Sequence, residues 1–119
     1  YLPIPTCIRV EKETSDIDLS IALMAALKAG ATVQLSTATM RPWMGTLSIK
    51  ITVESRTDYL GRMPSLATDG VHVRDTAATP EDMAVAAACG LHVNRDAIIG
   101  NGRIEMLHYL REQTITAKN

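Results

Sequence analysis

Segments with the period of a β-strand and segments with the spacing of a helix alternate along this chain, and this alternation restricts the fold more than any other feature. Residues 7–11 alternate apolar and polar side chains, residues 16–29 carry a helical pattern, and residues 32–36 again have a strand pattern. The helical segment is apolar on more than one stripe, so we expect it to be well buried. A strand, a helix and a strand with short connections predict parallel pairing through a right-handed crossover.

The same pattern continues to the end of the chain. Thr79 before Pro80 is the clearest helix start, because Thr accepts a free amide proton and Pro fits the first helical position. Further strands are expected over 48–53, 70–74, 91–94 and 114–116, and further helices over 55–62, 80–89 and 103–112, with Pro64 closing the first of these helices. The sequence therefore predicts an α/β fold, a Rossmann-like open, mostly parallel sheet with helices on both faces.

Length, charge and hydropathy narrow the possible partners. The chain has 119 residues, which fits one domain, and its 46% apolar and 21% charged residues are typical of a soluble globular protein. The net charge of −1 argues against a nucleic-acid binder or an anionic-membrane binder, because both need a basic surplus. The longest strongly apolar run, residues 21–27, is too short to span a bilayer, so no membrane span is expected.

The cysteines and the first residues indicate the setting of the domain. Cys7 and Cys89 show no CxxC spacing, and two reduced, buried cysteines favour a cytoplasmic protein. The chain begins without Met and opens on a proline-rich stretch, which is typical of a linker. We therefore expect a fragment of a longer protein or a processed chain, with residues 1–6 as a linker and residues 7–119 as the folded domain.

One glycine-rich turn is a candidate phosphate-binding loop. Gly100-Asn101-Gly102 precedes an expected helix whose first amide groups are free to bind an anion. A dinucleotide fingerprint requires a third glycine at position 105, where Glu105 stands, and a carboxylate there would repel a phosphate. A tight strand-to-helix turn is the favoured interpretation, so no cofactor-binding residue is expected.

No catalytic or metal-binding set of residues stands out in the sequence. His72, His92 and His108 lie on separate expected elements, without a second metal ligand at helical or hairpin spacing. Cys89 near His92 ends an apolar helix and lacks the positive environment that activates a thiol. The carboxylate pairs at 16 and 18 and at 81 and 82 sit at helix starts, where capping explains them. We therefore expect neither a catalytic site nor a metal site.

The segment from Met40 to Met44 is the candidate interface. It is apolar and irregular, it holds the only tryptophan, Trp43, and exposed Trp and Met side chains mark docking surfaces. The alternative is a loop folded onto its own core. Trp43 and Met44, together with Thr114, Ile115 and Thr116 of the last expected strand, are the candidate interface residues.

The second half of the chain resembles a known family. The stretch from Gly102 to Thr116 reads G-R-I-E-M-L-H-Y-L-R-E-Q-T-I-T, and this sequence is similar to the C-terminal end of bifunctional proline utilisation A proteins. These proteins combine a proline dehydrogenase with a delta-1-pyrroline-5-carboxylate (L-glutamate gamma-semialdehyde) dehydrogenase. Residues 7–11, the helix to Ala29 and residues 31–37 match the family more loosely. The resemblance spans nearly the whole chain and is specific over 90–116.

The resemblance implies an accessory domain rather than an enzyme. Residues 1–6 would be a linker from an upstream catalytic domain, and residues 7–119 a C-terminal aldehyde-dehydrogenase-like accessory domain. In the long members of the family, a C-terminal region similar to a decayed aldehyde dehydrogenase Rossmann half covers the path of the intermediate or helps assembly. It implies no cofactor for this chain, FAD and NAD for the parent enzyme, and an upstream aldehyde dehydrogenase domain of the same chain as partner, with a homo-oligomer left open. The family usually continues into a glycine-containing tail, whereas this sequence ends at Asn119.

Two other functions remain open at this point. The Rossmann-like pattern and Gly100-Asn101-Gly102 are compatible with a nucleotide-binding module. Trp43 and its methionine neighbours are compatible with an autonomous protein-interaction domain.

Overall fold

A parallel sheet forms the centre of the computed structural model, which describes residues 2–98 and 105–111. Within these residues the sheet consists of β2 (Thr6–Val10), β3 (Val33–Thr37), β4 (Lys50–Val53), β5 (His72–Arg74) and β6 (Val93–Asn94). Their order is β4-β3-β2-β5-β6, and all pairs are parallel. The order reverses at β2, as in doubly wound sheets. The predicted Rossmann-like open α/β fold is confirmed.

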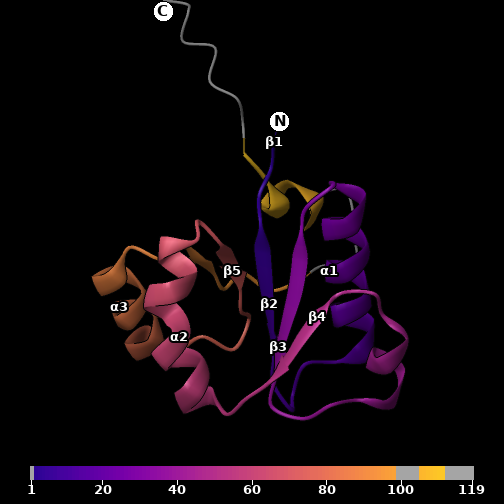
Figure 1. The fold of residues 1–119 in the computed structure, drawn as a ribbon, viewed down its shortest axis with the longest axis horizontal. Helices are drawn as coiled ribbons and strands as arrows, with labels where there is room; N and C mark the ends of the chain where they lie inside the picture. The colour runs from indigo at the N-terminus through magenta and orange to yellow at the C-terminus, as the bar shows by residue number, and fades with distance from the viewer. Residues whose placement is uncertain (1, 99–104, 112–119) are drawn as a thin grey trace, which may run out of the picture.

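Helices cover both faces of the sheet. Helix α1 (Asp16–Lys28) lies on one face, and α2 (Arg56–Thr68) and α3 (Pro80–Cys89) lie on the other (Figure 1). Each helix begins at a hydroxyl that accepts a hydrogen bond from a backbone N–H three residues on: Ser15, Ser55 and Thr79. These caps explain why the helix starts could be located from the sequence.

Alternation along β2 supplies the two cores. All five residues of β2 are buried, with Ile8 and Val10 facing α1 and Cys7 facing α2 and α3. A strand buried on both faces is the expected centre of a parallel sheet. None of the helices in the described part of the chain has the length and apolar character that a bilayer crossing requires.

Pro64 does not end α2, contrary to the sequence expectation. The helix continues through Pro64 to Thr68. Met63 and Leu66, on either side of the proline, are 0% and 3% exposed and pack in the core beneath α2 and α3. Packing of these side chains outweighs the hydrogen bond that proline removes, so the helix persists for another turn.

The helix expected over 103–112 is also wrong at its end. The described part is helical only as far as the 3₁₀ turn η2 (Leu107–Tyr109), and β7 (Leu110–Arg111) then pairs antiparallel with β1 (Leu2–Pro3). Tyr109 is fully buried, and its carbonyl accepts a hydrogen bond from the Ile4 N–H at 2.9 Å. That anchor turns the chain out of the helix. Residues 2–6 thus pack on the domain, and their role as a linker stays a prediction.

Helix α1 is less buried than its composition suggests. Its inner face, including Leu19 and Ala22, is fully buried, but Ile17 and Met24 are 74% and 70% exposed. The expectation of a well-buried helix is therefore wrong for the outer face, which no other described element covers.

Candidate functional site

The carboxyl ends of β2 and β5 form the point at which the strand order reverses. Open α/β sheets bind ligands in the crevice outside these ends, because the connections on the two sides leave in opposite directions. Glu11 follows β2 directly, and Asp75 follows β5 directly. This end of the sheet is therefore the candidate site.

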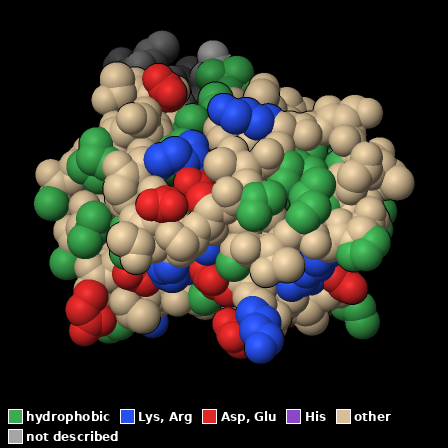
Figure 2. Space-filling model, turned by 60° about the horizontal axis from the view of Figure 1, so that its bottom comes forward, with side chains coloured by type: hydrophobic (Ala, Val, Ile, Leu, Met, Phe, Trp, Pro, Cys, Tyr) green, Lys and Arg blue, Asp and Glu red, His purple; other side chains and the backbone are tan. Residues whose placement is uncertain are grey.

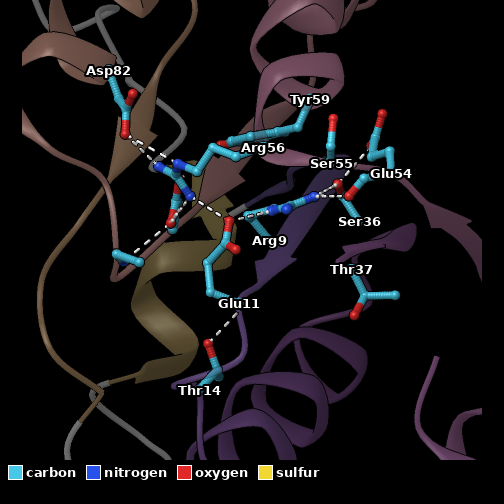
Figure 3. Close-up of polar contacts among 12 residues, drawn as sticks. Arg9, Glu11, Thr14, Ser36, Thr37, Glu54, Ser55, Arg56, Tyr59 and Asp82 are labelled. Carbon is cyan, nitrogen blue, oxygen red and sulfur yellow. Dashed lines mark hydrogen bonds and ion pairs between the residues drawn. The ribbon is translucent and has the colours of Figure 1, made fainter. Parts of the chain in front are cut away.

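A single guanidinium group joins the elements around the crevice. Arg56, in the first turn of α2, donates from Nη1 to Glu11 Oε2 at 2.6 Å and from Nη2 to Asp75 Oδ2 at 2.8 Å. Nη2 also contacts Asp82 Oδ2 of α3 at 2.5 Å (Figure 3). We call Arg56, Glu11, Asp75 and Asp82 the Arg56 cluster. It ties β2, β5, α2 and α3 together where a ligand would otherwise lie.

Arg9 extends the cluster into the interior. Its side chain points away from α1, is fully buried, and donates from Nε to Glu11 Oε2 at 2.7 Å and from Nη1 to Ser36 Oγ at 2.9 Å. The guanidinium carbon lies 4.9 Å from the centre of the Tyr59 ring. Within the described part of the chain, Arg9 Nη2 has no hydrogen-bond partner. The Tyr59 hydroxyl in turn donates to Asp75 Oδ2 at 3.0 Å.

A second carboxylate binds beside Arg9. Glu54 directly follows β4. Its Oε2 accepts a hydrogen bond from Ser36 Oγ at 2.6 Å and forms an ion pair with Arg62 Nη2, also at 2.6 Å. The Glu54 carbonyl accepts from Arg9 Nη1 at 3.1 Å. The strands β2, β4 and β5 are therefore each followed directly by a carboxylate that is paired within the domain.

The pKa shifts keep these groups in one charge state. Burial raises the pKa of the Glu11, Glu54 and Asp82 carboxyls, but hydrogen bonds from their neighbours outweigh burial, and each pKa falls below its usual value. Burial lowers the pKa of Arg56, but its three carboxylates raise it well above normal. A general acid or base needs a pKa near the working pH. These carboxyls and Arg56 are instead fixed charges, as structural ion pairs are.

A hollow of about 430 Å³ lies next to the cluster. Glu11, Lys12, Thr37, Thr39 and Arg41 line it. Arg41 is already engaged, because Nη1 pairs with Asp16 Oδ1 at 2.6 Å and Nη2 donates to the Thr14 carbonyl at 2.6 Å. Across this face, positive and negative side chains lie next to one another (Figure 2).

The loop at the hollow is poorly suited to a phosphate. Residues 11–15, between β2 and α1, read Glu-Lys-Glu-Thr-Ser and contain no glycine. Dinucleotide-binding turns at this place use glycines so that the backbone can approach the pyrophosphate. In addition, Ser15 caps the first turn of α1, and Asp16 and Asp18 add negative charge there. The residues present therefore do not fit a dinucleotide. The sequence candidate Gly100-Asn101-Gly102 lies outside the described residues.

Glu105 has a structural role on the opposite face. Its carboxylate pairs with Arg74, from Nε at 2.8 Å and from Nη2 at 2.9 Å, and accepts a hydrogen bond from the Tyr109 hydroxyl. Arg74 Nη1 also donates to Asn94 Oδ1 at 3.0 Å. Burial raises the pKa of Glu105, but Arg74 and Tyr109 outweigh it, so the pKa is lowered. Glu105 and Tyr109 thus bind the described segment of residues 105–111 to the sheet.

The candidate interface residues lie in different environments. Trp43 is half-buried, and its Nε1 donates to Asp16 Oδ1 at 3.2 Å. Met44, in the 3₁₀ helix η1 (Pro42–Thr46), is fully buried in the core and offers no surface. Thr114, Ile115 and Thr116 lie outside the described residues. Trp43 also lines an apolar groove of about 390 Å³ with Met24 and Leu27 of α1.

The histidines and cysteines do not form a reactive set. The centres of the His72 and His92 rings lie 4.5 Å apart. The sequence did not predict this contact, because the two residues belong to different expected strands. His108 Nδ1 contacts Asn94 Nδ2 at 2.8 Å. In the described ranges, no three His, Cys, Asp or Glu side chains are grouped for a metal ion. Burial raises the pKa of the Cys7 thiol to about 12, and Cys89 Sγ donates to the Ala86 carbonyl.

Sequence reasoning missed Arg56 and Asp75, and assigned Asp82 to capping alone. Asp82 does cap α3, since its carboxylate accepts from the Thr79 N–H at 3.0 Å, but it also pairs with Arg56. A usable signal existed, because Glu11, Glu54 and Asp75 each directly follow a strand. No protein-family model, curated protein or solved structure matches this chain.

Proposed function

We propose that this chain is a noncatalytic α/β accessory domain of a bifunctional enzyme that oxidises proline to glutamate through a proline dehydrogenase and an L-glutamate gamma-semialdehyde dehydrogenase. In this proposal the domain covers the path of the aldehyde intermediate or supports assembly of the enzyme. The proposal rests on the sequence from Gly102 to Thr116 and on the strand–helix–strand unit within residues 7–37, which resembles the same family more loosely.

The observation that carries the noncatalytic part is the Arg56 cluster. In a doubly wound sheet, the crevice at the strand reversal is where substrate or cofactor binds. Here Arg56 bridges Glu11, Asp75 and Asp82 across that crevice, at 2.5 to 2.8 Å. A charge that is paired three times and is fixed in one protonation state serves to hold elements together. The Arg56 cluster would therefore make the domain rigid, as a cover over another active site needs to be.

A rigid cover acts on a reaction without taking part in it. By closing the space between two active sites, it keeps water and competing reagents from the aldehyde and raises its local concentration at the second site. The domain then needs a stable sheet and a docking surface, and it needs no reactive side chain.

The test uses the parent enzyme with and without residues 7–119. Proline oxidation and oxidation of added aldehyde, each assayed alone, are expected to keep most of their rate in the shortened enzyme. Coupled conversion of proline to glutamate is expected to show a lag, and a trapping reagent is expected to capture more free aldehyde. If the lag, the trapped fraction and the oligomeric state all stayed unchanged, the accessory role would be lost.

A nucleotide-binding module is the competing function, and the glycine-free loop at 11–15 speaks against it. Calorimetric titration of the chain with NAD separates the two. We expect no saturable heat up to about millimolar NAD, a range that includes weak cofactor sites. A saturable heat that Arg56→Met alters would favour the nucleotide function instead.

A further inference from the structure

The outer face of α1 carries an apolar stripe that the described residues leave uncovered. Ile17, Met24 and Leu27 are 74%, 70% and 51% exposed, and Ser20 lies between them on the same face. The positions 17, 20, 24 and 27 repeat at alternating steps of three and four, which is the spacing of a helix that packs along another helix. Scattered exposed apolar residues are ordinary, but exposed apolar residues aligned along one face of a helix favour an interface.

A groove runs beside this stripe. It has a volume of about 390 Å³ and lies between α1 and the segment that leads from η1 to β4. Met24 and Leu27 form one wall, and Trp43, Leu47 and Ile49 form the other. The Trp43 ring is fixed there by its hydrogen bond to Asp16. The stripe and the groove together give a raised apolar ridge next to an apolar recess, the shape that an isologous contact requires.

We propose that α1 packs antiparallel against α1 of a second copy of this chain, forming a two-fold dimer. The charges along the helix favour this occupant: Asp16 and Asp18 stand in its first turn and Lys28 in its last. When two copies are paired antiparallel at the level of Ala22, whose own side chain faces the sheet, Asp16 lies opposite Lys28 of the second copy while it also pairs with Arg41 of its own copy. The helix dipoles also oppose each other in this arrangement, whereas parallel pairing would place like charges together.

The same register pairs the apolar side chains by size. With Ala22 at the centre, Ile17 lies opposite Leu27 of the second copy, and the small Ser20 lies opposite the long Met24. A small residue facing a large one lets helices interdigitate, and Met adapts to an irregular groove. One face is therefore complementary to itself in both charge and shape. This inference does not depend on the accessory role proposed above, since it concerns only the surface of this chain.

The dimer is tested by sedimentation of the 119-residue chain from about 1 µM to about 1 mM, the range in which small interfaces associate. We expect a concentration-dependent monomer–dimer equilibrium. Met24→Glu is expected to raise the dissociation constant about tenfold or more, because a charge would be buried against the apolar stripe. Val85→Glu is the matched control, because Val85 is an exposed apolar residue of α3 on the opposite face, and it should leave the constant unchanged.

The antiparallel register has its own variant. Lys28→Glu places carboxylates opposite each other at both ends of the helix pair and should raise the dissociation constant about two- to tenfold, with the effect shrinking at high salt. Arg95→Glu makes the same charge change at an exposed site beyond β6 and should have no such effect. Circular dichroism and a cooperative unfolding transition establish that each variant folds. A chain that stays monomeric throughout, or a dimer that Met24→Glu and Val85→Glu weaken equally, overturns the proposal. A dimer unaffected by Lys28→Glu overturns the antiparallel pairing.

Discussion

Arg74 and Glu105, which are 31 residues apart in the chain, meet in a two-point ion pair whose side chains are only 2% and 1% exposed. The pair connects the end of β5 to the described segment of residues 105–111. Tyr109 adds a hydrogen bond from its hydroxyl to the same carboxylate. The last described part of the chain is therefore bound to the sheet by charge as well as by apolar packing.

Replacing Glu105 should strongly destabilise the domain. Glu105→Gln keeps the shape of the side chain but leaves the guanidinium of Arg74 without its counter-charge, and removing one partner of a buried pair costs about 3 kcal/mol. Urea unfolding followed by circular dichroism measures this loss. Glu13→Gln, an exposed change of the same type, should leave the free energy of unfolding nearly unchanged. Equal losses in the two variants would show that the ion pair is not the cause.

Acid should destabilise the domain through the same carboxylates. The pKa values of Glu11, Glu54, Asp82 and Glu105 are lowered in the fold. A lowered folded pKa contributes stability above the ordinary carboxyl pKa of about 4, and that stability is lost as the pH falls through the folded value. We therefore expect the midpoint temperature of thermal unfolding to decrease as the pH is lowered from about 5 to about 2. Glu105→Gln should show a shallower fall, and a midpoint independent of pH would contradict the pairing.

Removing the central arginine should reverse part of this pH dependence. Arg56→Met leaves Glu11, Asp75 and Asp82 facing one another without a cation, so repulsion raises the pKa values of Glu11 and Asp82 and their protonation becomes favourable in the fold. We expect a loss of about 2 kcal/mol near neutral pH, partly regained at about pH 5. Urea unfolding at both pH values measures the difference. Arg95→Met, at an exposed site, should show neither the loss nor the recovery.

The two thiols should differ in their reaction with alkylating reagents. Burial raises the pKa of Cys7 to about 12, so only about one molecule in ten thousand carries the reactive thiolate near pH 8. Cys89 is half-buried at the end of α3 and more accessible. Mass spectrometry after brief exposure to iodoacetamide should find a single label, at Cys89, in the folded protein and two labels in urea. Rapid labelling of Cys7 in the folded chain would mean that the core beneath α2 opens readily.

Local patterns located most elements but not the contacts between them. The caps at Ser15, Ser55 and Thr79 were visible because a hydroxyl and the amide it accepts are three residues apart. Pro64 misled the prediction because the packing of Met63 and Leu66 decides how far α2 extends, and that packing involves distant strands. The end of the last helix failed for a similar reason, since Leu110 leaves it to pair with Pro3.

The candidate site was harder to foresee than the fold. Glu11, Arg56 and Asp75 are far apart in the sequence, and only the strand order brings them within hydrogen-bond distance. Parallel strands end at one edge of a sheet, so a polar residue directly after each strand was the signal available. The counter-charge, Arg56, begins a helix, where a basic residue has no local reason to be. The contact between His72 and His92 likewise depends on the pairing of β5 with β6.

The pairing of Leu2 with Arg111 and of Pro3 with Leu110 brings the first and last described strands to the same pole of the domain. Tension applied at both ends would part β1 from β7 first, bond by bond, before it reached the hydrogen bond between Ile4 and Tyr109 and the sheet beneath. A unit whose first and last described strands lie side by side can also be inserted into a surface loop of a host protein with little distortion of the host backbone.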